Sequence, residues 1–133
     1  MRLRDIVRGS LSMVFFSGAA ANLFIYLTNT QLYRGFADLA FLALYRELWS
    51  QVVYPRMGWF LAGIILLELG IAYALTRSGK IVQLGLAAAA FFMVGLVPFW
   101  WNGGALGNVV IGLLCVWLFV YRYERPLWRW SGG

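Results

Sequence analysis

Four long apolar segments constrain this chain more than any other feature of its sequence. A helix needs about 20 residues to cross a bilayer core of roughly 30 Å, with about 17 as the lower limit. Four segments reach this length, the last one with help from flanking aromatic residues: 11–28, 57–76, 81–101 and 105–121. A soluble domain of 133 residues, 62% of them hydrophobic, could not bury so much apolar surface. The sequence therefore predicts one all-α domain over residues 1–133, an integral membrane four-helix bundle.

The distribution of lysine and arginine predicts how the bundle is oriented. Three of these residues lie in the loop between the first two apolar segments, and eight fall on the opposite side if the chain crosses four times: Arg2, Arg4, Arg8, Arg77, Lys80, Arg122, Arg125 and Arg129. The net charge of +6 is then a positive-inside signal and no sign of nucleic-acid binding. We expect a multi-pass protein of the bacterial cytoplasmic (inner) membrane with both termini cytoplasmic.

The loop at 29–56 is too long and too apolar for a plain connector. It predicts short interfacial helices between the first and second transmembrane helices, lying at the outer membrane surface or capping the bundle. Tryptophan is favoured at both membrane interfaces. We therefore predict two outer and two inner anchors, in that order: Trp100, Trp101, Trp128 and Trp130.

A single carboxylic acid, Glu68, lies within the apolar run "GIILLELGIAYAL". An ionised carboxylate at that depth costs at least a few kcal/mol. Either the carboxyl group keeps its proton, or it faces a polar interior with partners. The first apolar segment offers such partners, since Asn22 lies at a similar depth when both helices rise about 1.5 Å per residue. We predict an intramembrane polar pocket that joins Glu68 and Asn22 with Tyr26 and Ser17.

Two interpretations of this pocket remain open. Acids inside membranes are often functional, and the pocket would then accept a proton from, or bind the polar head of, a lipophilic molecule such as a quinone. A carboxyl group that only hydrogen-bonds neighbouring helices would instead specify packing. With one acid and no second titratable partner at that depth, the sequence does not choose between them.

Small residues predict where helices approach closely. Gly63, Gly70 and Ala74 lie on the face opposite Glu68, and we expect this face to pack on another helix of the chain or on another subunit. Gly18 is the corresponding small residue of the first segment.

Missing residue types exclude several chemistries. The chain has no histidine and only one cysteine, Cys115, so an intramolecular disulfide relay, a histidine-ligated haem and the usual zinc sites are excluded. A Ser–His–Asp set is equally excluded, and the other acids lie outside the core segments. We predict no catalytic residue, no metal site and no bound cofactor, with only a quinone or a lipid left open as a ligand.

The stretch "AGIILLELGIAYALTRSGKIVQLGL", residues 62–86, resembles the signature region of the DoxX-like family of small four-helix bacterial membrane proteins. Glu68 and Gly70 match the family pattern in the second helix, and Gly18 matches it in the first. Members are linked with membrane oxidoreductase systems, including thiosulfate-to-quinone electron transfer, and with oxidative-stress complexes. The resemblance implies an accessory or quinone-proximal subunit, because this chain lacks ligands for a redox cofactor.

Three functional hypotheses follow. The chain is a non-catalytic accessory subunit or assembly factor of a larger membrane complex, a quinone- or lipid-binding redox component that uses Glu68, or a small oligomeric transporter or channel. The sequence favours the first, a role outside enzyme catalysis. Its expected partners are membrane lipids and other membrane protein subunits or further copies of the chain, with no nucleic acid.

Overall fold

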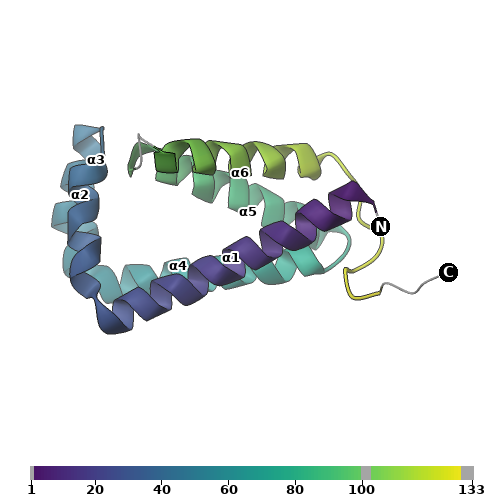
Figure 1. Ribbon diagram of the computed structural model, residues 1–133, viewed down its shortest axis with the longest axis horizontal. Coiled ribbons are helices and arrows are strands. Elements are labelled where there is room, and N and C mark those ends of the chain that lie inside the picture. Colours follow the sequence, from purple (N-terminus) through teal and green to yellow (C-terminus); the bar gives the residue numbers. More distant parts are fainter. Residues whose placement is uncertain (1, 100–102, 130–133) are drawn as a thin grey trace.

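The computed structural model describes residues 2–99 and 103–129, which contain helices and no strand. The long helices are α1 (Leu3–Thr28), α4 (Met57–Thr76), α5 (Lys80–Leu96) and α6 (Gly103–Phe119). Figure 1 shows them as two pairs, α1 with α4 and α5 with α6. The pairs converge at the end that holds the first and last described residues, Arg2 and Arg129, and diverge toward the opposite end.

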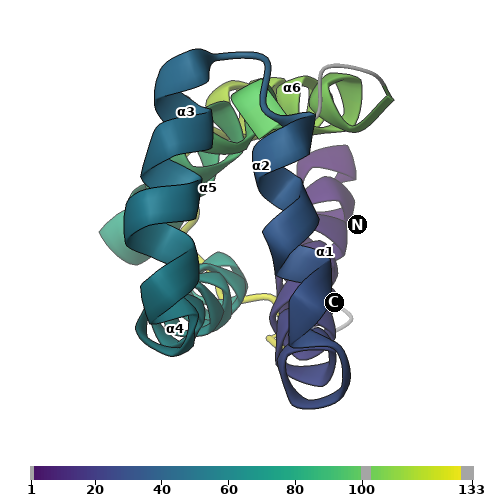
Figure 2. The ribbon, with the colours of Figure 1, turned by 90° about the vertical axis from the view of Figure 1, so that its left-hand side faces the viewer.

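The diverging end is bridged by a helical hairpin, which we call the cap (residues 30–56). It runs through η1 (Thr30–Gly35), α2 (Phe36–Leu39), α3 (Ala43–Leu48), the π-helical η2 (Trp49–Val53) and η3 (Tyr54–Arg56). Figure 2 shows the two arms standing side by side across that end. At the tip, the Phe41 backbone N–H donates to the Pro98 carbonyl at 3.0 Å. The loop predicted to hold short helices is therefore helical over most of its length.

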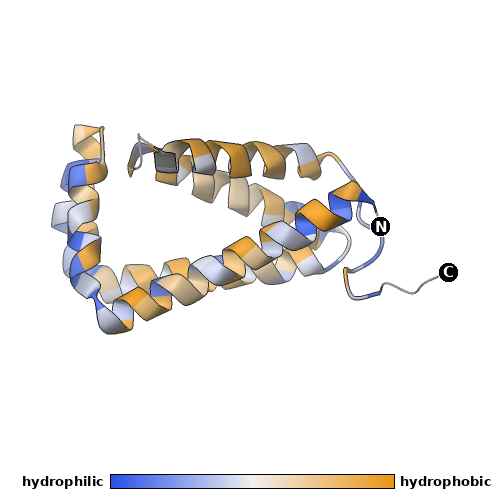
Figure 3. Ribbon diagram, viewed as in Figure 1, coloured by the Kyte–Doolittle hydropathy of each residue, from blue (hydrophilic) through white to orange (hydrophobic). Residues whose placement is uncertain are grey.

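Within the described residues, three helices are long and apolar enough to cross a membrane: Leu3–Thr28, the continuous run Ala43–Thr76, and Lys80–Phe99. The fourth apolar helix, α6, has 17 residues. In Figure 3 apolar residues dominate all four long helices, and hydrophilic residues gather near the N-terminus and in the cap.

The helix boundaries differ from the predicted ones at five of the eight ends, by one residue at the start of α5 (Lys80) and by two at the start of α6 (Gly103). The first helix begins at Leu3 and not at residue 11, because residues 3–10, which mix charged and apolar side chains, are helical as well. The α-helical part of the third segment stops at Leu96, and a 3₁₀ turn, Val97–Phe99, follows around Pro98. Proline lacks the N–H that would continue the α-helical ladder. The last helix ends at Phe119 and not at residue 121.

The apolar interior has two parts. The larger core lies among the four long helices and includes a tilted ring contact between Phe15 of α1 and Phe92 of α5, with centroids 6.5 Å apart. A second, aromatic core lies under the cap, where Trp49 meets Phe99 edge-on at 5.1 Å. The cap is therefore packed onto the end of the bundle.

Candidate functional site

Glu68 lies on the face of α4 that meets α1, and only 6% of its surface is exposed. The Asn22 amide donates a hydrogen bond to Glu68 Oε2 at 2.9 Å. Gly18, one turn before Asn22, makes room for the carboxyl group, because a Cβ at position 18 would lie 2.7 Å from Glu68 Oε1. Gly18 and the Asn22 amide, on one face of α1, thus surround the Glu68 carboxyl group.

The cap extends this polar contact. The Tyr33 hydroxyl lies 3.0 Å from Asn22 Oδ1 and 3.1 Å from the Asn22 carbonyl, and donates to these oxygens. The Trp49 indole N–H in turn donates to the Tyr33 carbonyl at 2.7 Å. Burial, and then the nearby Glu68, raise the pKa of Tyr33, so its hydroxyl keeps the proton that it donates. A chain of hydrogen bonds therefore runs from the cap to the acid inside the bundle.

Two residues predicted for the pocket do not join it. Ser17 is exposed, because at 3.6 residues per turn it lies about 140° around α1 from Asn22. Tyr26 lies on the Asn22 face but one turn further toward the cap, where its hydroxyl approaches Gly58. Tyr33 takes the place expected for them. The sequence alone could not place Tyr33, because its position depends on how the cap folds back.

Among the predicted packing residues of α4, Ala74 contacts a neighbouring helix, whereas Gly63 and Gly70 do not. Ala74 is buried against α5, where a Cβ at Gly85 would lie 2.7 Å from the Ala74 methyl. Gly63 and Gly70 are exposed, with no atom within 4 Å of an added Cβ. The two helix pairs diverge along α4, and none of the described residues covers this part of its face.

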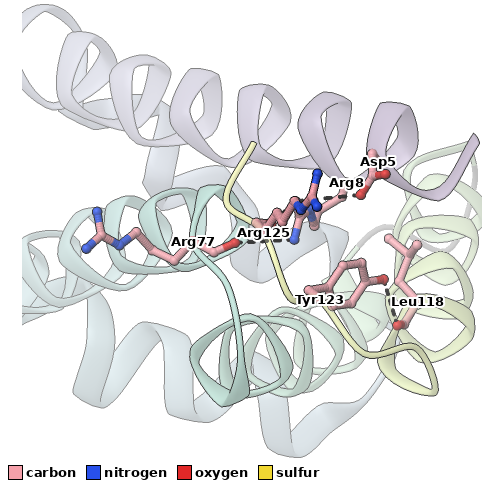
Figure 4. Close-up of polar contacts among 6 residues, drawn as sticks. All are labelled: Asp5, Arg8, Arg77, Leu118, Tyr123 and Arg125. Atoms are coloured by element: carbon pink, nitrogen blue, oxygen red, sulfur yellow. Dashed lines mark hydrogen bonds and ion pairs between the residues drawn. The ribbon is translucent and has the colours of Figure 1, made fainter. Parts of the chain in front are cut away.

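A second polar cluster lies at the converging end, where Arg8 of α1 is only 1% exposed (Figure 4). Its guanidinium donates to the carbonyls of Arg77 at 3.3 Å and Arg125 at 3.4 Å. It also lies 3.7 Å from the Asp5 carboxylate and stacks over the Tyr123 ring at 4.5 Å. Arg8 thus joins α1 to the α4–α5 turn and to the segment after α6.

Tyr123 completes this cluster by donating its hydroxyl to the Leu118 carbonyl at 2.8 Å. Burial raises the pKa of Tyr123, and the positive charges of Arg8 and Arg4 oppose that rise. Two buried nitrogens, Nε of Arg4 and Nε of Arg8, have no hydrogen-bond partner in the described part of the chain. The sequence identified Arg8 only as a topology signal, because its burial depends on contacts with the segment after α6.

Of the four predicted tryptophan anchors, only Trp128 belongs to the described residues. It is largely exposed at the converging end, where the Arg77 guanidinium lies 4.8 Å from its ring centre. The other three, Trp100, Trp101 and Trp130, lie outside the described residues.

No family model, curated protein or solved structure matches this chain. The resemblance to the DoxX-like family therefore stays a prediction. Within residues 2–99 and 103–129, no group of three or more acidic, cysteine or histidine side chains is arranged to hold a metal ion. The site offers one buried carboxyl group, that of Glu68. It accepts a hydrogen bond from the Asn22 amide, which in turn accepts one from the Tyr33 hydroxyl.

Proposed function

We propose that the chain is a four-crossing protein of the bacterial inner membrane with both termini in the cytoplasm. Among the described residues, three helices are long and apolar enough to span a membrane, which supports this topology. The fourth, α6, is about 25 Å long, close to the thickness of the hydrocarbon core. Eight of the eleven lysine and arginine residues lie in segments at the converging end, which also holds the first and last described residues.

Cysteine labelling tests this topology. In a Cys115→Ser background, Ser50→Cys in the cap should react with a membrane-impermeant maleimide on intact cells. Ser78→Cys in the α4–α5 turn should react only after lysis. Equal labelling of both positions on intact cells would refute the orientation.

We further propose that the protein is a non-catalytic accessory subunit or assembly factor of a larger membrane complex. The observation that carries this proposal is the packing of Glu68 against α1. Asn22 donates a hydrogen bond to its carboxyl group, and Gly18 lies in close contact with the same group. These contacts tie α1 to α4 and, through Tyr33, to the cap. An acid held between helices in this way specifies packing.

The second candidate function is a redox component in which Glu68 accepts a proton from a lipophilic ligand such as a quinone. The observation in its favour is the hydrogen-bond chain from the cap through Tyr33 and Asn22 to Glu68. These bonds hold the carboxyl group in a fixed position, and a carboxylate can act as the base that accepts a proton from a bound ligand.

Native purification in mild detergent followed by intact-complex mass spectrometry distinguishes the two functions. An accessory subunit should be recovered with other subunits in fixed ratio, and Glu68→Gln should be recovered with the same set and leave the activity of that complex unchanged. Glu47→Gln, in the exposed part of the cap, is the matched control for removal of one acid. A lone chain carrying a quinone, or a Glu68→Gln complex that assembles but loses activity, would refute the accessory role and favour the redox component.

A further inference from the structure

The outer side of the α5–α6 pair carries two neighbouring cavities of opposite character. The first, of about 610 Å³, lies at the converging end and is lined by polar and charged side chains, among them Ser78, Lys80, Gln83, Arg122 and Glu124. Its two cations and one carboxylate leave one net positive charge. Within the described residues, neither cation takes part in an ion pair or a side-chain hydrogen bond.

The chain itself builds this cavity. Gly79, in the left-handed region with φ of 69°, turns the backbone sharply between α4 and α5. Its N–H donates to the Tyr123 carbonyl at 2.6 Å, and the Leu127 N–H donates to the Thr76 carbonyl at 2.9 Å. The segment after α6 is therefore fastened to the α4–α5 turn, and the cavity lies where the two meet.

The second cavity is an apolar groove of about 340 Å³ between α5 and α6. On α5 it is lined by Ala87, Ala90 and Val94, among others. These follow Lys80 and Gln83 at intervals of three and four residues, so all five lie within one arc of about 80° on the helix.

The wall on α6 continues in the same direction. Cys115, Val116 and Phe119 line the groove, and Arg122 lies one turn further toward the converging end. Gln83 and Val94 are about 16 Å apart along α5, close to half the roughly 30 Å thickness of a bilayer core. One continuous face thus offers cations at its end and an apolar trough one leaflet long.

We propose that this face is a binding site for one anionic phospholipid of the cytoplasmic leaflet. The phosphate would lie between Lys80 and Arg122, the headgroup hydroxyls would donate to Glu124, and an acyl chain would fill the groove between α5 and α6. The net charge of +1 in the cavity matches the single negative charge of a phosphodiester, and a free phosphate would leave the apolar groove empty. The proposal uses the membrane orientation proposed above, which cysteine labelling tests separately, and does not depend on the role of Glu68.

Native mass spectrometry of the full chain in detergent, titrated with defined lipids, tests the proposal. Phosphatidylglycerol should bind as a single retained copy, at least about 10-fold more tightly than phosphatidylcholine, since each cation at an anionic headgroup contributes strongly. Lys80→Gln/Arg122→Gln should remove most of this preference. Arg2→Gln/Arg129→Gln removes the same charge at the same end but outside the cavity, and should keep it.

A separate variant tests whether the apolar groove contributes to lipid binding. Ala90→Trp fills the groove and should weaken phosphatidylglycerol binding, whereas Leu66→Trp, at a largely exposed position of α4, should not. Circular dichroism of each variant shows that it is folded. The proposal is refuted if Lys80→Gln/Arg122→Gln binds like its control, if Ala90→Trp binds like Leu66→Trp, or if glycerol phosphate without acyl chains competes as well as the lipid.

Discussion

The close approach of α4 and α5 gives the sharpest test of the packing. At Gly85, an added Cβ would lie 2.7 Å from the Cβ of Ala74, whereas ordinary contacts of this kind are 3.4–4 Å. The Ala74 methyl is attached directly to the backbone and has no torsion that could move it aside. Gly85→Ala must therefore push α4 and α5 apart by roughly 1 Å or distort one of them.

The expected cost follows from two opposing effects. Overpacking of a well-filled contact costs about 1–3 kcal/mol. Replacing a helical glycine by alanine gains roughly 0.5–1 kcal/mol of backbone entropy. We expect Gly85→Ala to lower the free energy of unfolding by about 1–2 kcal/mol. Gly70→Ala, with no atom within 4 Å of the new Cβ, should raise it by roughly 0.5–1 kcal/mol.

The measurement is unfolding in mixed micelles, titrated with sodium dodecyl sulfate and followed by far-ultraviolet circular dichroism. The two variants should differ by about 2 kcal/mol, or roughly 30-fold in the unfolding equilibrium. Adding Ala74→Gly to Gly85→Ala removes the opposing methyl, so the double-mutant cycle should show strong coupling. The reasoning fails if Gly85→Ala is as stable as Gly70→Ala, or if the two changes at the contact simply add.

Three further predictions use the same unfolding assay. Burial raises the pKa of Tyr123 above 10.0, so its neutral hydroxyl stabilises the fold below about pH 10, and that contribution is lost at higher pH. Tyr123→Phe should therefore reduce the loss of stability at alkaline pH. An unchanged pH profile would contradict this prediction. Arg8→Met should cost about 1–3 kcal/mol and speed tryptic cleavage of the segment after α6, whereas the exposed Arg2→Met should do neither. Ser12→Ala removes a buried 2.8 Å hydrogen bond to α4 and should cost about 0.6 kcal/mol, against no change for the exposed Ser10→Ala.

The pairing of Asn22 with Glu68 was within reach of the sequence because it depends only on regular helix geometry. Two helices that are adjacent in the chain and cross the same layer bring residues of similar depth together. The same geometry, applied by angle as well as by depth, excludes Ser17. Tyr33 was out of reach, since its contact with Asn22 requires the cap to fold back over the end of the bundle.

Arg8 shows a different limit of sequence reasoning. A positive charge at the start of an apolar segment usually marks the cytoplasmic side and remains in the headgroup layer. Here α1 begins at Leu3, so Arg8 lies in its second turn, underneath the segment that follows α6. Its burial is produced by a segment more than a hundred residues away, which no local pattern near Arg8 indicates.

The two helix pairs are held together by different kinds of contact. This difference explains both the position of Glu68 and the position of the apolar groove between α5 and α6. Between membrane helices there is no hydrophobic driving force, so close packing and hydrogen bonds must specify each contact. On α1, Ser12 and Asn22 lie about 15 Å apart and each bonds to α4, which fixes the register of that pair at two depths.

Between α5 and α6, no side-chain hydrogen bond is found in the described residues, and their outer seam opens into an apolar groove. A pair without directional contacts is the one whose packing an acyl chain can complete, because the chain replaces only dispersion contacts. The polar seam of α1 and α4 offers a lipid nothing comparable, since its hydrogen-bonding groups already have partners. Glu68 is thus internal because polar residues specify the packing of α1 on α4. The groove is external because the described residues of α5 and α6 lack such contacts, which leaves their outer seam open to a lipid.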